Sequence, residues 1–123
     1  MGRWGRGAAV VQGATVRTTL GKRSVMLALA AFGAAAVAIV TMVAMPSDAS
    51  QLAQNVATGF FMAVFLLVAP LAHITGAVFG LMALARSNDS RALGLLGIVL
   101  NGLSVAAGLV LLAAMASTIG AFT

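Results

Sequence analysis

Three long apolar runs dominate this 123-residue sequence, and only short polar breaks separate them. The runs cover residues 24–45, 61–85 and 92–119. At about 1.5 Å per residue, each is long enough to cross a hydrocarbon core of about 30 Å as a helix. A composition of 62% hydrophobic and only 7% charged residues excludes an ordinary soluble domain. We therefore expect an all-α integral membrane protein with three transmembrane helices.

The cationic side chains all fall on one side of this topology. Five precede the first run, two bracket the break between the second and third runs, and the remaining break and residues 120–123 contain none. Because Lys and Arg near span ends are retained in the cytoplasm, we expect an N-in/C-out, multi-pass protein of the bacterial inner membrane. The residues expected at the lipid interface, beside anionic headgroups, are Trp4, Arg17, Lys22, Arg23, Arg86 and Arg91. These cations form no helical stripe and have one aromatic neighbour, so nucleic acid is not an expected partner.

The breaks define the remaining segments. Residues 1–23 predict a basic, mostly flexible cytoplasmic tail, because their apolar content is low. The run over residues 24–45 exceeds the 7–15 residues typical of a signal-peptide core, so we interpret it as a retained helix. Residues 46–60 predict an external loop with an interfacial helix, from which Gly59, Phe60 and Phe61 turn the chain inward. We expect a kink near Pro70, a cytoplasmic turn over residues 86–91 and an external tail over residues 120–123.

Small and polar residues form one stripe on each of the last two runs. Their spacing alternates between three and four positions, which places each set on one helix face. Since small residues let helices approach closely in lipid, we expect a tight, glycine-packed hairpin of the second and third helices. The stripes comprise Ala69, His73, Gly76, Gly80 and Ala83 on the second run, and Gly94, Gly97, Asn101, Ser104 and Gly108 on the third. Counting from the turn centre predicts His73 level with Ser104, and Thr75 near Asn101.

His73 is the one ionisable residue within a predicted span, which makes it a candidate functional site. One interpretation is a neutral histidine hydrogen-bonded inside the hairpin, with no cofactor bound. The alternative is a ligand to haem or to a bacteriochlorophyll-type pigment, although bis-histidine haem needs a second histidine that this chain lacks.

Catalytic residue types are almost absent. The only acids, Asp48 and Asp89, fall on opposite sides of the predicted membrane, and the chain has no Glu, Tyr or Cys. General acid–base chemistry and a serine triad both need a carboxylate near their base. We therefore expect no enzymatic activity.

Residues 71–103 carry a hairpin pattern of two glycine-containing helices around the polar turn Arg86–Arg91. The pattern consists of Gly76, Gly80, Ala83, Leu84, Gly94, Leu95 and Gly97. It resembles the bacterial "domain of unknown function 4190" family. The resemblance implies a small inner-membrane protein with a glycine-packed hairpin, and it implies no activity.

The sequence favours a non-catalytic structural or accessory subunit, which packs against a larger membrane assembly or against copies of itself. Its expected partners are the lipid bilayer and other membrane subunits, because nearly all of the chain is span. Two alternatives remain open. One is a cofactor-contacting subunit of a photosynthetic or respiratory complex that uses His73; the other is a subunit of an oligomeric channel or transporter.

Overall fold

A computed structural model of the chain describes residues 19–120, apart from the side chains of residues 118 and 119. Its elements are α2 (Thr19–Val43), α3 (Gln51–Ala63), the π-helical turn η1 (Val64–Val68), α4 (Ala69–Ala85) and α5 (Arg91–Gly120). Because α3, η1 and α4 run on as one helix, the described chain has three helices long and apolar enough to cross a membrane. The prediction of an all-helical fold with three helices able to span a membrane is thus confirmed for residues 19–120.

The first helix begins earlier than the sequence predicted. Lys22 and Arg23, expected in a flexible tail, lie in the first turns of α2, which starts at Thr19. Hydrogen bonds to Asp89 hold this start of the helix, as described below. The rest of the predicted tail, with Trp4 and Arg17, lies outside the described residues, as does the predicted external tail beyond Gly120.

A helix forms in the segment where an interfacial helix was predicted, but the predicted inward turn at residues 59–61 is absent, because α3 continues into η1 and α4. The loop after α2 ends at Ser50, whose hydroxyl accepts a hydrogen bond from the Ala53 N–H and so caps α3. The helix then passes through Gly59 without a break. Its buried residues on this stretch, Ala57 and Val64, lie on either side of Gly59, so a turn there would separate them.

Pro70 is accommodated by a local widening of the helix. Proline has no N–H, so the carbonyl of Leu66 loses its usual α-helical donor. The π-helical turn η1 lies directly before this position, and the Ala69 N–H donates to the Val64 carbonyl, five residues back. Such π-turns are a recognised way for a helix to absorb an interrupted hydrogen-bond ladder.

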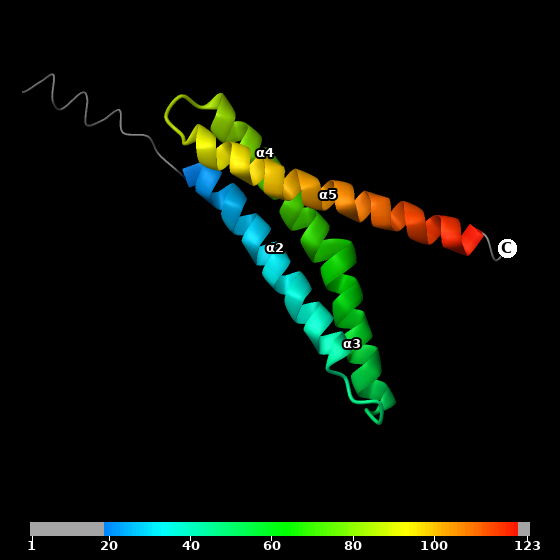
Figure 1. The fold of residues 1–123 in the computed structure, drawn as a ribbon. Helices are drawn as coiled ribbons and strands as arrows, with labels where there is room; N and C mark the ends of the chain where they lie inside the picture. The colour runs from blue at the N-terminus through cyan, green and yellow to red at the C-terminus, as the bar shows by residue number, and fades with distance from the viewer. Residues whose placement is uncertain (1–18, 121–123) are drawn as a thin grey trace, which may run out of the picture.

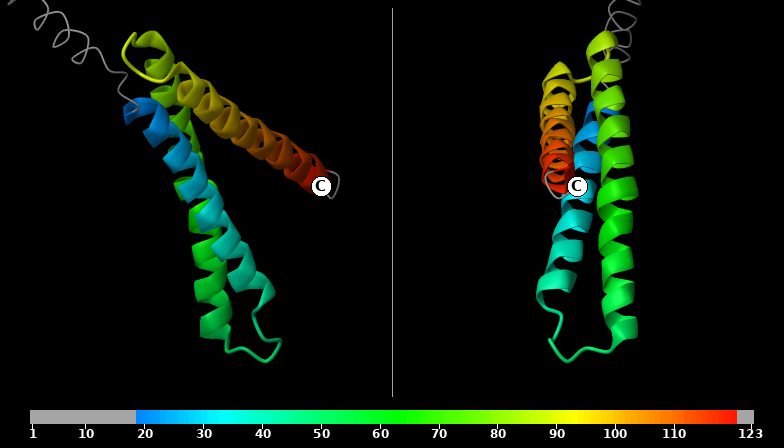
Figure 2. Two further views of the ribbon diagram at one scale, coloured as in Figure 1. Left: turned by 60° about the vertical axis from the view of Figure 1, so that its left-hand side comes forward. Right: turned by 90° about the vertical axis from the view of Figure 1, so that its right-hand side faces the viewer.

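The three long helices do not pack along their whole lengths. Figure 1 shows α2 antiparallel to the α3–η1–α4 helix, whereas α5 lies beside them at one end and then diverges, as the left view of Figure 2 also shows. Asn101 is the last buried residue of α5, and residues 106–117 are exposed all round. We call the end formed by residues 19–31, 73–85 and 89–101 the three-helix end. The two-helix end comprises residues 32–43 and 51–68.

Candidate functional site

A buried amide joins all three helices at the three-helix end. Asn101 of α5 has no exposed surface. Its Nδ2 donates to the Gly97 carbonyl of its own helix at 2.7 Å and to the Ser24 carbonyl of α2 at 3.1 Å, and lies 3.4 Å from the Ser24 hydroxyl. Its Oδ1 lies 3.0 Å from Nδ1 of His73 on α4. One side chain therefore fixes the relative positions of α2, α4 and α5.

Ser24 supplies the second link between helices. Its side chain is fully buried, and its hydroxyl donates to the Gly76 carbonyl of α4 at 2.6 Å. The contact requires glycines, because a Cβ at Gly76 would lie 2.5 Å from Asn101 Nδ2 and a Cβ at Gly97 would overlap the Ser24 hydroxyl. The close approach of three backbones is what allows these short side chains to meet.

Ser24 was not among the site residues predicted from the sequence, although the spacing of small residues on α2 could have indicated it. The buried residues of α2 follow helical spacing and most of them are small: Leu20, Gly21, Ser24, Ala28, Ala31 and Ala38. This stripe resembles those on the other two runs. The stripe is hard to recognise in the sequence, because the first run is rich in alanine and Ala30, Ala34, Ala35 and Ala36, none of them buried, lie between its members.

His73 is held in one tautomer by this network. Because Asn101 uses Nδ2 as the donor to carbonyls, its Oδ1 faces His73, and the network assigns the proton of the neutral imidazole to Nδ1. The ring also packs against Phe32 of α2, with centroids 5.1 Å apart and planes tilted by 58°. The residue is only 7% exposed. Within the described chain, Nε2 has no hydrogen-bond partner, and it keeps some accessible surface.

Most residues of the two predicted stripes lie along the contact between helices. Ala69, Gly76, Gly80, Ala83, Gly94 and Gly97 are all buried. A Cβ at Gly80 would lie 2.8 Å from the Gly94 carbonyl, and one at Gly94 would lie 3.0 Å from Ala83 Cβ. These positions thus admit no larger side chain without movement.

Ser104 and Gly108, the last two members of the stripe on the third run, lie outside the contact between helices. The register of α4 against α5 also differs from the predicted one. Ser104 is half-buried and donates to the Leu100 carbonyl of its own helix, so it does not meet His73. Gly108 is exposed, and a Cβ there would touch nothing. Thr75 is exposed too, which corrects its expected position near Asn101. The cause is the angle of α5, which crosses α4 near Asn101 and does not run alongside it. Counting residues from the turn assumes contact along the whole hairpin and therefore pairs residues that lie beyond the crossing point.

A buried carboxylate closes the three-helix end. Asp89, in the turn before α5, is 5% exposed. Its oxygens accept hydrogen bonds from the backbone N–H groups of Leu20 at 3.1 Å, Gly21 at 3.4 Å and Ser90 at 2.8 Å. The first two are free N–H groups of the first turn of α2, where a negative charge also meets the favourable end of the helix dipole. Asp89 thus caps a helix from across the fold.

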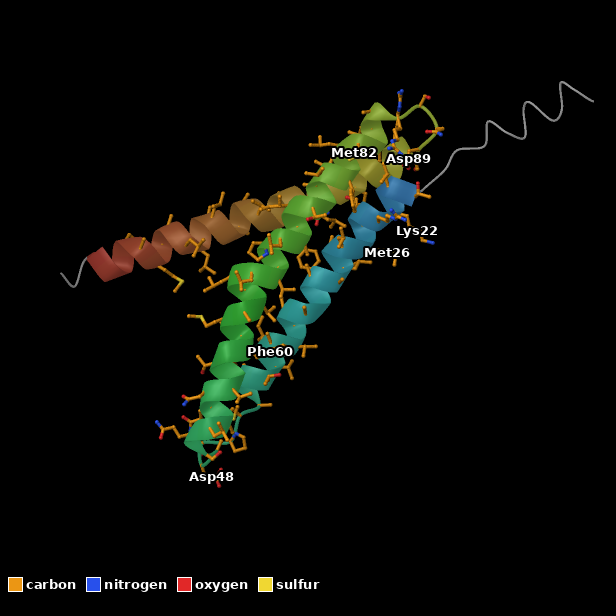
Figure 3. The ribbon with its side chains drawn as sticks, turned by 180° about the vertical axis from the view of Figure 1, so that it is seen from behind. Lys22, Met26, Asp48, Phe60, Met82 and Asp89 are labelled. Carbon is orange, nitrogen blue, oxygen red and sulfur yellow. The ribbon has the colours of Figure 1, made fainter. Side chains whose placement is uncertain are left out.

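Charged residues gather at the two ends of the described molecule. Figure 3 shows Lys22 and Asp89 at the three-helix end and Asp48 at the opposite end. Arg23, Arg86 and Arg91 belong to the first turns of α2, the end of α4 and the start of α5, and all are exposed. The long separation between the two acids leaves no carboxylate pair for acid–base chemistry in residues 19–120.

The buried cluster is suited to holding helices together. No group of three metal-binding side chains occurs among the described residues. Every buried polar side-chain atom of this part of the chain has a hydrogen-bond partner. Comparison with protein-family models, curated proteins and solved structures found no match for this chain. The interpretation of function therefore rests on the site itself.

Proposed function

We propose that this protein is a non-catalytic accessory protein of the bacterial inner membrane, which packs its helices against another membrane protein or against a second copy. The observation that carries the proposal is the distal half of α5. Residues 106–117 leave the bundle and are exposed on all sides, although the proximal half of the same helix is fixed by Asn101. Helix association in lipid depends on packing, and the exposed side chains of this half are accessible to a partner.

The proposal includes an orientation and a mode of internal packing. We place the three-helix end in the cytoplasm, because it carries the described cations Lys22, Arg23, Arg86 and Arg91. The hairpin of α4 and α5 is proposed to be glycine-packed, since an added Cβ at Gly76, Gly80 or Gly94 would lie within 3.0 Å of an atom of the facing helix. The resemblance to the 4190 family would fit such a hairpin and stays a prediction.

The experiment is site-specific photo-crosslinking in native membranes, followed by mass spectrometry. A photoreactive residue at Val110, which is 70% exposed on distal α5, should give a discrete protein adduct. The matched control is Val43, which is 81% exposed at the end of α2 and should give mainly lipid adducts. An adduct with a different protein indicates a subunit of a larger assembly, and an adduct with the same chain indicates a homo-oligomer. Lipid adducts alone at both positions would contradict the proposal.

A second candidate function is supported by the free nitrogen of His73. A histidine that ligates a metal commonly donates its other ring N–H to an oxygen acceptor, which fixes the ring and the tautomer. Asn101 Oδ1 provides this acceptor, and Nε2 has no partner in the described chain. The chain would then contribute one axial ligand to a haem or chlorophyll-type cofactor of a larger complex. His73 also lies at the level where α5 leaves the other helices.

The test for this second function is the absorption spectrum of the complex isolated in mild detergent. His73→Leu should abolish or shift a cofactor band, and Asn101→Asp, which retains an oxygen acceptor, should shift it less. Ser104→Ala, on the next turn of α5, is the control that should leave the band unchanged. A complex with no cofactor band in the parent protein rejects this candidate and leaves the accessory role intact.

A further inference from the structure

A shallow, almost wholly apolar groove lies between α2 and α4, and the stem of Arg23 forms part of its lining. It has a volume of about 400 Å³ and is lined by Arg23, Met26, Leu27 and Ala30 of α2 and by Phe79 of α4. The four α2 residues follow helical spacing and form one strip along the helix. No residue of α5 lines the groove, so it opens on a face that the third helix leaves uncovered.

Arg23 is the only charged residue of the groove and lies at its terminal end, one turn after the start of α2. Its guanidinium is exposed and makes no hydrogen bond or ion pair within the described chain. Arginine offers planar, paired N–H donors that match phosphate oxygens. Near the membrane surface its long stem can lie along apolar atoms while the charged group stays at headgroup level.

The rest of the groove is apolar and suits a hydrocarbon chain. Beyond Arg23, the lining runs through Met26 and Leu27 to Ala30, whose small side chain leaves a depression beside the helix. Met26 is 57% exposed, and Figure 3 shows it on α2 near the end that carries Lys22. Methionine is unbranched and adapts its shape to a neighbouring chain. A polar group at one end and a narrow apolar strip beyond it match the two parts of a lipid.

We propose that this groove binds one phospholipid with an anionic headgroup, with its phosphate on the Arg23 guanidinium and one acyl chain along Met26, Leu27 and Ala30. A second groove provides a comparison within the molecule. It has a similar volume, about 420 Å³, lies between α2 and α3 at the two-helix end, and is lined by residues such as Thr41, Val56 and Phe60 without any charge. That groove should accept any lipid without preference for the headgroup.

The inference does not depend on the accessory role, because a lipid bound to α2 and α4 would stay with the isolated chain. The experiment uses the full chain in nanodiscs of phosphatidylcholine with a minor fraction of phosphatidylglycerol. Native mass spectrometry after release into mild detergent would count the retained lipids and identify their headgroups. We expect one phosphatidylglycerol per chain, retained in preference to phosphatidylcholine.

Two variants address the two halves of the site. Arg23→Gln removes the charge and with it a charge-assisted hydrogen bond to the phosphate, so it should lower phosphatidylglycerol retention about tenfold, the ratio that corresponds to about 1.4 kcal/mol. Ala30→Leu keeps the charge, fills the depression and should lower retention of the same lipid. The matched control is Arg91→Gln, which makes the same chemical change at the same end, on a helix that does not line the groove.

The outcomes separate a built site from a general attraction of charge. Loss in Arg23→Gln and Ala30→Leu, with normal retention in Arg91→Gln, supports the site. Equal losses in both arginine variants would mean that anionic lipid is held by surface charge alone. Retention that is unaffected by Ala30→Leu would place the acyl chain elsewhere and overturn the proposal. Free phosphate added during the release step should not displace the lipid, because it lacks the acyl chain.

Discussion

The two ends of the bundle are held together by different means. At the three-helix end, Ser24, His73 and Asn101 form a buried polar network between α2, α4 and α5, and Gly76 and Gly97 lie directly against it. At the two-helix end, α2 meets α3 over small or apolar side chains such as Ala38 and Ala57, and no third helix covers them. In lipid, exposing a leucine costs little, so close packing and hydrogen bonds supply the association energy. We therefore expect the stability of the fold to depend mainly on the three-helix end.

The largest effect should follow from Asn101→Leu. The substitution removes the acceptor of His73 and the donor to Ser24, so buried polar groups on two other helices lose their partner. Each unsatisfied buried group costs about 1–3 kcal/mol, which suggests a loss of about 2–4 kcal/mol of stability for the variant. The measurement is the unfolding midpoint in mixed micelles of a mild detergent and a denaturing detergent.

The control for this prediction is Ser104→Ala, on the next turn of α5. Ser104 bonds only to the Leu100 carbonyl of its own helix, so its loss should change stability by less than about 0.5 kcal/mol. If the two variants unfold at the same detergent fraction, the polar network contributes no more to stability than one hydrogen bond within α5. The proposed difference in stability between the two ends would then be wrong.

The sequence predicts the parts of this fold that depend on length and periodicity. Hydrophobic run length locates three helices, and three–four spacing places His73, Gly76, Gly97 and Asn101 on the faces that meet. Both signals are local, because each can be read along one helix. The crossing angle of α5 depends on how two surfaces fit. The predicted pairing of His73 with Ser104 was wrong by nearly one helical turn for this reason.

Two further features depend on contacts between distant segments. Asp89 and Ser90 are neighbours in the turn before α5, yet Ser90 caps α5 by accepting from the Leu93 N–H, whereas Asp89 caps α2. Both residues have the chemistry of a cap, and only the tertiary fold decides which helix each one serves. The continuous helix through Gly59 also depends on a distant segment. Glycine permits a bend at this position, but packing against α2 determines whether the bend occurs.

The second prediction tests close approach without removing a polar group. Gly97→Ala places a methyl group where the Ser24 hydroxyl lies, so α2 and α5 must separate or Ser24 must leave the network. Overpacking of this kind costs about 1–3 kcal/mol. Gly102→Ala is the matched control on the same helix, because a Cβ there meets nothing. It should be neutral or stabilising by up to about 1 kcal/mol through helix propensity, measured by the same detergent titration.

The third prediction concerns the cap supplied by Asp89. Asp89→Ala leaves the N–H groups of Leu20 and Gly21 without acceptors, and loss of a helix cap costs about 0.5–2 kcal/mol. The start of α2 should then exchange its amide hydrogens faster, which hydrogen exchange with mass spectrometry can locate. Asp48→Ala at the opposite end is the control, since Asp48 is exposed and should change exchange at α2 little. Equal exchange in the two variants would show that the turn does not hold α2.

The smallest effect on stability should come from the distal half of α5. Leu111 is 59% exposed, and its described neighbours on distal α5 are exposed as well. In an isolated chain, Leu111→Ala should therefore change the unfolding midpoint by less than about 0.5 kcal/mol, while it weakens crosslinking from Val110 to a partner. Weaker crosslinking without a loss of stability is expected only if Leu111 contacts a partner protein and no other part of its own chain. If Leu111→Ala instead destabilises the isolated chain as much as Gly97→Ala does, then distal α5 folds back onto α3 in the membrane, and both the contrast between the two ends and the proposed docking role would have to be abandoned.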